Sequence, residues 1–232
     1  MEKLSELSVF FPAYNEEKNI KETVLRAAKI LPKIASKYEI IIVDDGSTDK
    51  TGEIAERLAK EKEFVKVVHH RPNRGYGAAL KSGFSESRYS WVAFSDADGQ
   101  FDFSEIEKFL PLTRKADLIL GYRIQRADSP TRRFGTFVWF FLARILLGLN
   151  VRDYSCGFKL IKKRVFEEVQ PLTAEEKVTQ IELLVKARRL GFKFAEVGVS
   201  HHPRKFGQQT GANIKVVARS FLDLFRLWQK IK

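Results

Sequence analysis

Cysteine is almost absent from this chain of 232 residues, in which Cys156 stands alone. A single cysteine excludes an internal disulfide, which fits a reducing compartment such as the cytoplasm. Long apolar runs are missing as well. The most apolar stretch, 134–151, is interrupted by Arg144 and is shorter than the ~20 residues of a membrane span. Because residues 1–8 carry charges and no apolar segment, we expect no secretory signal and a soluble or peripheral protein.

Acidic residues are in deficit, since 41 Lys and Arg face 29 Asp and Glu and leave a net charge of +12. This surplus favours anionic partners such as phosphates, nucleic acid or acidic lipid head groups, without selecting among them. A basic nucleic-acid-binding protein is therefore one alternative. No helix-turn-helix, ribonucleoprotein or zinc-finger pattern supports it, so we expect no nucleic-acid partner.

Short apolar runs rich in β-branched residues alternate with helical patterns along the first half of the chain. Strands are expected at 7–11, 40–43, 65–68, 91–94 and 118–120, and helices at 16–36, from 49 and at 78–85. The alternation predicts an α/β fold with a mostly parallel sheet flanked by helices. Ligands of such sheets bind beyond the carboxyl ends of the strands, where the polar clusters of this sequence lie.

Two carboxylates, Asp96 and Asp98, follow the fourth expected strand. Carboxylates two residues apart at the end of a strand can share a hard cation such as Mg²⁺ or Mn²⁺, and the Gln100 side-chain oxygen would add a ligand. Such an ion would neutralise the charge of a departing diphosphate. The alternative is a solvated acidic turn.

A second polar cluster, residues 44–49, follows the second expected strand. Its carboxylates would accept hydrogen bonds from a base or ribose, while Ser47, Thr48 and Asp49 are suited to cap the next helix. Residues 75–79 are rich in glycine and open a helix, like a dinucleotide-binding turn. Their place after the third strand and Leu80 at the last small position argue against that interpretation.

Three motifs, in this order, resemble those of the family 2 glycosyltransferases with the GT-A (Rossmann-like) fold: Pro12-Ala13-Tyr14-Asn15-Glu16, Asp44-Asp45-Gly46-Ser47-Thr48-Asp49 and Asp96-Ala97-Asp98-Gly99-Gln100. Four later segments look like the dolichol- or polyprenyl-phosphate sugar synthase branch: Gly121-Tyr122-Arg123, Cys156-Gly157-Phe158-Lys159, Ile181-Glu182-Leu183-Leu184 and Glu196-Val197-Gly198-Val199. The resemblance covers nearly the whole chain and is more specific for the family than for the branch.

The resemblance implies a role for each matching residue. It places the nucleotide sugar against Pro12, Ala13, Tyr14, Glu16, Val43, Asp45, Asp96, Ala97, Asp98 and Arg204. It places the metal on Asp96, Asp98 and Gln100, and the acceptor phosphate on Arg123, Arg132, Arg133 and Thr136. Asp96, Asp98 and Arg123 are the expected catalytic residues. After Gly207 the chain departs from the branch pattern, because Gln208-Gln209-Thr210 stands where Ser-Lys is usual.

The implied function is an inverting, Mg²⁺- or Mn²⁺-dependent transfer of a monosaccharide from a nucleotide diphosphate sugar, of GDP-mannose or UDP-glucose type, to a polyprenyl or dolichyl phosphate. The alternative within the family is transfer to a sugar hydroxyl. Arginines 123, 126, 132 and 133 lie beside the apolar stretch 134–149, which would suit either an isoprenoid tail or the protein core.

The C-terminal segment is set apart by its composition. We expect a catalytic domain over 1–211 and an amphipathic helix over 212–232, whose apolar stripe includes Leu224, Phe225 and Trp228 and whose charges are mostly basic. Such a helix can lie at the cytoplasmic face of a membrane or pack on its own domain or a partner.

Overall fold

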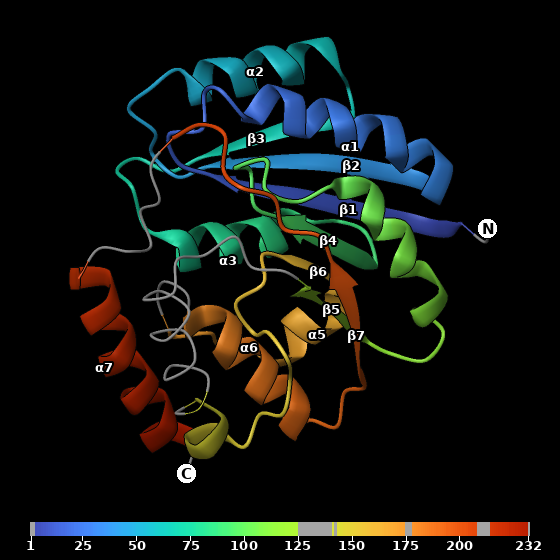
Figure 1. Cartoon of the computed structure of the whole chain (residues 1–232). Helices are drawn as coiled ribbons and strands as arrows, with labels where there is room; N and C mark the ends of the chain where they lie inside the picture. The colour runs from blue at the N-terminus through green and yellow to red at the C-terminus, as the bar shows by residue number, and fades with distance from the viewer. Residues whose placement is uncertain (1–2, 125–140, 142, 175–177, 208–213, 232) are drawn as a thin grey trace.

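The computed structural model describes residues 3–124, 141, 143–174, 178–207 and 214–231. A seven-stranded sheet runs through the molecule in the order β3-β2-β1-β4-β6-β5-β7 (Figure 1). Its strands are β1 (Leu4–Ala13), β2 (Ala35–Asp44), β3 (Val65–His69), β4 (Trp91–Ser95), β5 (Leu118–Arg123), β6 (Phe158–Lys162) and β7 (Phe194–Val199). Only β6 pairs antiparallel with its neighbours, so the sheet is mostly parallel, as the sequence predicts.

Helices cover both faces of the sheet. They are α1 (Ile20–Ile34), α2 (Thr51–Glu61), α3 (Tyr76–Glu86), α5 (Lys163–Glu168), α6 (Val178–Arg189) and α7 (Ile214–Ile231), with 3₁₀ turns η1 (Phe103–Lys108) and η2 (Leu110–Leu112). Figure 1 shows α1 and α2 on one face of the sheet and α3, α5 and α6 on the other. Parallel strands need such crossovers, and their helices bury both faces.

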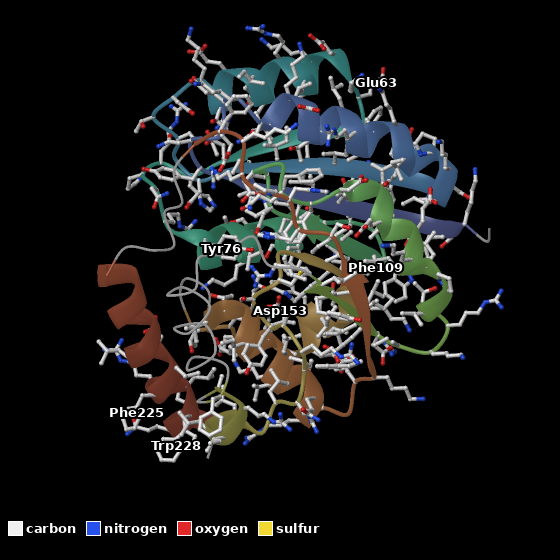
Figure 2. The ribbon with its side chains drawn as sticks, viewed as in Figure 1. Glu63, Tyr76, Phe109, Asp153, Phe225 and Trp228 are labelled. Carbon is white, nitrogen blue, oxygen red and sulfur yellow. The ribbon has the colours of Figure 1, made fainter. Side chains whose placement is uncertain are left out.

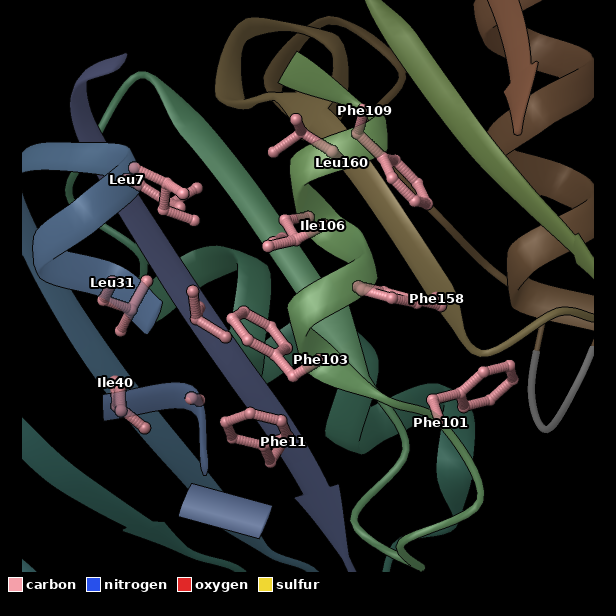
Figure 3. Close-up of a cluster of buried hydrophobic side chains, with 14 of the residues drawn as sticks. Leu7, Phe11, Leu31, Ile40, Phe101, Phe103, Ile106, Phe109, Phe158 and Leu160 are labelled. Atoms are coloured by element: carbon pink, nitrogen blue, oxygen red, sulfur yellow. The ribbon is translucent and has the colours of Figure 1, made fainter. Parts of the chain in front are cut away.

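The core consists of two apolar layers, one on each side of the sheet. Strand residues alternate between them: Val9 and Phe11 belong to the layer under α1, whereas Phe10 belongs to the layer under α3. Figure 3 shows the first layer, in which Phe11 lies near Phe103 of η1. Because successive side chains of a strand point to opposite faces, each central strand packs against the helices on both sides of the sheet. The carboxyl ends of the parallel strands lie at one edge of the sheet.

The helix before β2 ends earlier than the sequence predicts. Expected to continue to residue 36, α1 ends at Ile34, and Ala35 already pairs with Leu4 of β1. The N-cap position of α2 is occupied by Lys50, and Asp49 before it accepts the N–H of Thr51 on its Oδ1 at 2.9 Å.

The C-terminal helix α7 packs on α6 through one of its sides. Leu224 and Leu227 are buried in the layer under α3, whereas Leu222 and Phe225 are exposed. Figure 2 places Phe225 and Trp228 at the periphery of the molecule. Among the described residues, none of the helices combines the length and apolar character needed to cross a membrane.

Candidate active site at the carboxyl edge of the sheet

The loops that follow β1 and β2 are joined by side-chain hydrogen bonds. Ser47 Oγ accepts the N–H of Asn15 at 3.0 Å, and Asn15 Oδ1 accepts the N–H of Thr48 at 2.8 Å. Asn15 adopts a left-handed backbone conformation with φ 56°, which asparagine tolerates better than most residues. On the two sides of Asn15 in this loop, Tyr14 is 36% exposed and Glu16 is buried.

Asp45 organises the loop that follows β3. Its carboxylate contacts His70 Nδ1 at 2.6 Å and accepts Asn73 Nδ2 at 2.9 Å and the backbone N–H groups of Arg74 and Gly75. The sequence places this residue at the nucleoside. The structure shows that both its oxygens already bind protein donors, so Asp45 also fixes the loop that borders the expected nucleoside position.

The Asp-x-Asp segment lies directly after β4, as expected. Asp96 Oδ1 accepts the hydroxyl of Tyr76 at 2.9 Å, and Asp98 Oδ1 accepts the N–H of Gln100 at 3.1 Å. Gln100 is buried and donates its amide N–H to the carbonyl of His202 at 2.8 Å. Gln100 thus ties this segment to the loop that follows β7, and its amide oxygen is the atom that would bind a metal.

Arg204 lies between the buried carboxylate of Glu16 and the largely covered carboxylate of Asp98, although 188 residues separate it from Glu16. Its guanidinium is paired with Glu16, its Nη1 lies 3.7 Å from Asp98 Oδ2, and its Nε donates to the carbonyl of Phe206. Burial raises the pKa of Glu16 and that of Asp98, against the opposing charge of Arg204. Arg204, Glu16 and Asp98 thus form a compact cluster in which one positive charge offsets part of the negative charge of two carboxylates.

Arg123 stands at the end of β5 and is held by Asp153, which is buried. Its Nε and Nη2 donate to the two carboxylate oxygens at 2.8 and 3.0 Å, and Nη2 also donates to Ser155. The charge of Arg123 acts on Asp98 together with that of Arg204, which lowers the pKa that burial raises. The charges of both guanidinium groups therefore act on Asp98.

The other expected acceptor residues, Arg132, Arg133 and Thr136, lie outside the described residues. Pro12, Ala13 and Val43 lie at the ends of β1 and β2, where Pro12 pairs with Val43 and Ala13 with Asp44. Ala97 is buried between the two aspartates.

Sequence reasoning missed several residues that surround Asp96. Tyr76 was noticed only as part of a glycine-rich turn, and no role was assigned to Gly157, Lys159 or Gln180. A Cβ on Gly157 would lie 2.0 Å from Asp96 Oδ2, so only glycine fits there. Lys159 was recognisable as a charge between the apolar residues Phe158 and Leu160 of β6, but the contacts of its side chain depend on the fold.

The chain matches known proteins along most of its length. The model of the family "Glycosyl transferase family 2" matches residues 8–170. Glycosyltransferase AglD of Haloferax volcanii is 32% identical over 86% of this chain and 33% of its own length. Dolichyl-phosphate beta-glucosyltransferase of Saccharomyces cerevisiae is 30% identical over 84% of this chain and 66% of its own. Polyprenol monophosphomannose synthase of Mycolicibacterium smegmatis is 30% identical, with 89% and 82% covered.

Solved structures share the fold at lower identity. Glucosyl-3-phosphoglycerate synthase from Mycobacterium tuberculosis, in complex with Mn²⁺ and UDP-glucose, has a TM-score of 0.72 at 20% identity. The alignment covers 97% of this chain and 79% of that one. The present chain thus spans only about a third of AglD and 66% of the yeast enzyme.

Proposed function

Because the chain belongs to glycosyl transferase family 2, we propose that it transfers a monosaccharide from a nucleotide diphosphate sugar to a polyprenyl phosphate. One observation carries the proposal: Asp98, two residues from Asp96, has only 15% of its side chain exposed and is acted on by the charges of Arg204 and Arg123. Relatives named as dolichyl-phosphate glucosyltransferase and polyprenol monophosphomannose synthase support a lipid phosphate acceptor. Family membership also argues against the alternative of a nucleic-acid-binding protein.

The donor set fits Mg²⁺ or Mn²⁺. Within the described part of the chain, His, Cys, Asp and Glu side chains form no group of three or more suited to hold a metal. Mg²⁺ is commonly bound by only one or two carboxylates together with substrate phosphates and water. Asp96 and Asp98, with the amide oxygen of Gln100, supply oxygen ligands of this kind. The bound ion would neutralise charge on the departing diphosphate.

The arginines suit the two phosphate groups of the reaction. Arg204 would exchange its pairing with Glu16 and Asp98 for the donor diphosphate, and Arg123 would orient the acceptor phosphate with its plane fixed by Asp153. An acceptor oxygen then attacks the anomeric carbon as the bond to the diphosphate breaks. Attack from the opposite face inverts the configuration at that carbon.

A phosphate acceptor needs no general base, because it is already an anion near neutral pH. Glu182, the one acid of α6, has a structural role here. Its carboxylate accepts the N–H groups of Thr173 and Ala174 at 2.9 and 2.6 Å and pairs with Lys186 at 2.7 Å. This use of Glu182 favours the phosphate acceptor over a sugar hydroxyl.

The acceptor assignment predicts a sharp difference between two lipids. With GDP-mannose or UDP-glucose as donor, a polyprenyl phosphate should accept sugar at least ~10²-fold faster than the matching polyprenol, because the alcohol lacks a positioned base. Release of GDP or UDP and mass spectrometry of the lipid product measure this and identify the donor. Comparable transfer to the polyprenol, or to a free sugar, would move the protein to the hydroxyl-glycosylating branch.

We also propose that the protein contacts the membrane surface through α7. Leu222 and Phe225 are exposed on this helix, and the side chains of Arg226 and Lys230 add positive charge. An apolar and basic helix surface of this kind can insert into the interface of an anionic membrane.

Binding to anionic liposomes should therefore be salt-sensitive and should fall about tenfold in the double variant Leu222→Ser/Phe225→Ser, because two apolar side chains no longer insert. The same substitution at Leu190, also exposed but at the end of α6, is the control. Substitution is preferable to deleting the residues after Asn213, because the deletion also removes the buried side chains of Leu224 and Leu227 and exposes the apolar surface that they cover. Sedimentation of the double variant equal to that of wild type would contradict the role of α7.

A further inference from the structure

Lys159 is a buried cation behind the candidate active site. It stands on β6 with 1% of its surface exposed. Its Nζ donates to the carbonyl of Tyr154 at 3.1 Å and also to the carbonyl of Cys156 and to Gln180 Oε1. An ammonium has three donors and no acceptor, so all its hydrogen bonds point outward from this charge.

This lysine fixes the direction of a chain of hydrogen bonds. Because Gln180 Oε1 must accept from Lys159, its Nε2 is the group that donates to the Tyr76 hydroxyl oxygen, at 3.0 Å. The hydroxyl proton of Tyr76 is then directed to Asp96 Oδ1, at 2.9 Å. A donor chain therefore runs from β6 through α6 and α3 to the carboxylate after β4.

We propose that Lys159, Gln180 and Tyr76 are positioning residues that hold Asp96 in the rotamer that binds the metal and the diphosphate. The proposal rests on the proposed function, since it assigns Asp96 to the metal. Such partners of a ligating carboxylate set its orientation, and losing one typically weakens metal binding. Gly157 supports the same geometry from the Oδ2 side, where no larger residue fits.

The protonation states of the chain agree with this direction. Burial lowers the pKa of Lys159 to about 8, so the ammonium remains charged at neutral pH. The Tyr76 hydroxyl can accept and donate at once, so accepting from Gln180 leaves its proton for Asp96. If Lys159 served only to tie residues 154–156 to β6, its hydrogen bond to Gln180 and the bond from Gln180 to Tyr76 would not be needed.

Tyr76→Phe removes one hydroxyl and leaves the ring in place. In the full chain with saturating UDP or GDP, we expect the Kd for Mn²⁺, measured by electron paramagnetic resonance, to rise by about 10–100-fold. Thr179→Val is the matched control, because it removes a buried hydroxyl next to Gln180 that bonds only the carbonyl of Ala174 in the described structure. This control should bind Mn²⁺ as wild type does, whatever its melting temperature.

Lys159→Met removes the ammonium group that is the first donor of this chain of hydrogen bonds. Like Tyr76→Phe, it should raise the Kd for Mn²⁺. Should that variant fail to fold, Tyr76→Phe alone decides. Wild-type affinity for Mn²⁺ in folded Tyr76→Phe would overturn the positioning role while leaving the metal site intact. Failure of the wild type itself to bind Mn²⁺ with either nucleotide would instead overturn the proposed metal-dependent function, and the positioning role with it.

Discussion

Asp98→Asn is expected to lower the rate of sugar transfer by about 10²–10³ while the protein stays folded, because a charge that stabilises the departing diphosphate is lost. Asparagine retains an oxygen to accept the N–H of Gln100, as Asp98 does at 3.1 Å, so the loop should keep its shape. The side chain of Asp98 is only 15% exposed, so its charge is less screened by water than a surface charge is. Steady-state release of GDP or UDP, with Mn²⁺ and a polyprenyl phosphate, measures the change.

Asp102→Asn is the matched control for this experiment. Asp102 follows the same segment but caps η1, where its Oδ1 accepts the N–H of Ser104 at 3.0 Å. We expect nearly full activity from this variant. Undiminished transfer by Asp98→Asn, or by wild type in excess EDTA, would rule out the metal role of the Asp-x-Asp segment.

Arg123→Ala should raise the KM for the polyprenyl phosphate by about 10–100-fold, because one charge-assisted contact to an anion is worth about 1.5–3 kcal/mol. Binding of the nucleotide sugar should change little, since Arg204 faces that side. Arg123→Lys should fall in between, because a lysine keeps the charge but not the planar guanidinium. Acceptor titrations at saturating donor, together with calorimetry of donor binding, separate the two effects.

Loss of Arg123 also leaves Asp153 buried without its bidentate partner, which by itself repels a phosphate and destabilises the fold. The double variant Arg123→Ala/Asp153→Asn removes that charge as well. If the acceptor KM stays high in the double variant, the missing cation is the cause. A return to the wild-type KM there would show that Arg123 only compensates Asp153, and Arg152→Ala controls for loss of a nearby exposed charge.

The order of strands and helices along the first half of the chain was predictable, because buried strands and amphipathic helices have different apolar periods. The expected strand at 91–94 is observed as Trp91–Ser95, and that at 65–68 as Val65–His69. The end of α1 was wrong by two residues, and β2 begins at Ala35 rather than at residue 40. Ala35 has no local preference strong enough to oppose its pairing with Leu4 in β1, some thirty residues earlier.

The family and the Asp-x-Asp segment followed from the sequence, since both depend on residues adjacent in the chain. The family assignment is confirmed, whereas the roles of the individual site residues remain predictions. The structure added the partners of those residues. Arg204 reaches Glu16 across 188 positions, and Asp45 holds the loop after β3 in addition to any contact with a nucleoside.

The sequence by itself therefore determined the type of fold and the carboxylates at the ends of its strands, because local periodicity and short motifs encode them. Only the tertiary structure decided what surrounds those carboxylates. The chain from Lys159 through Gln180 and Tyr76 to Asp96 joins four segments whose pairwise separations, 21, 104 and 20 positions, carry no periodic signal. Such contacts arise because the crossovers of a parallel sheet bring distant segments to one edge, where buried polar groups must find partners.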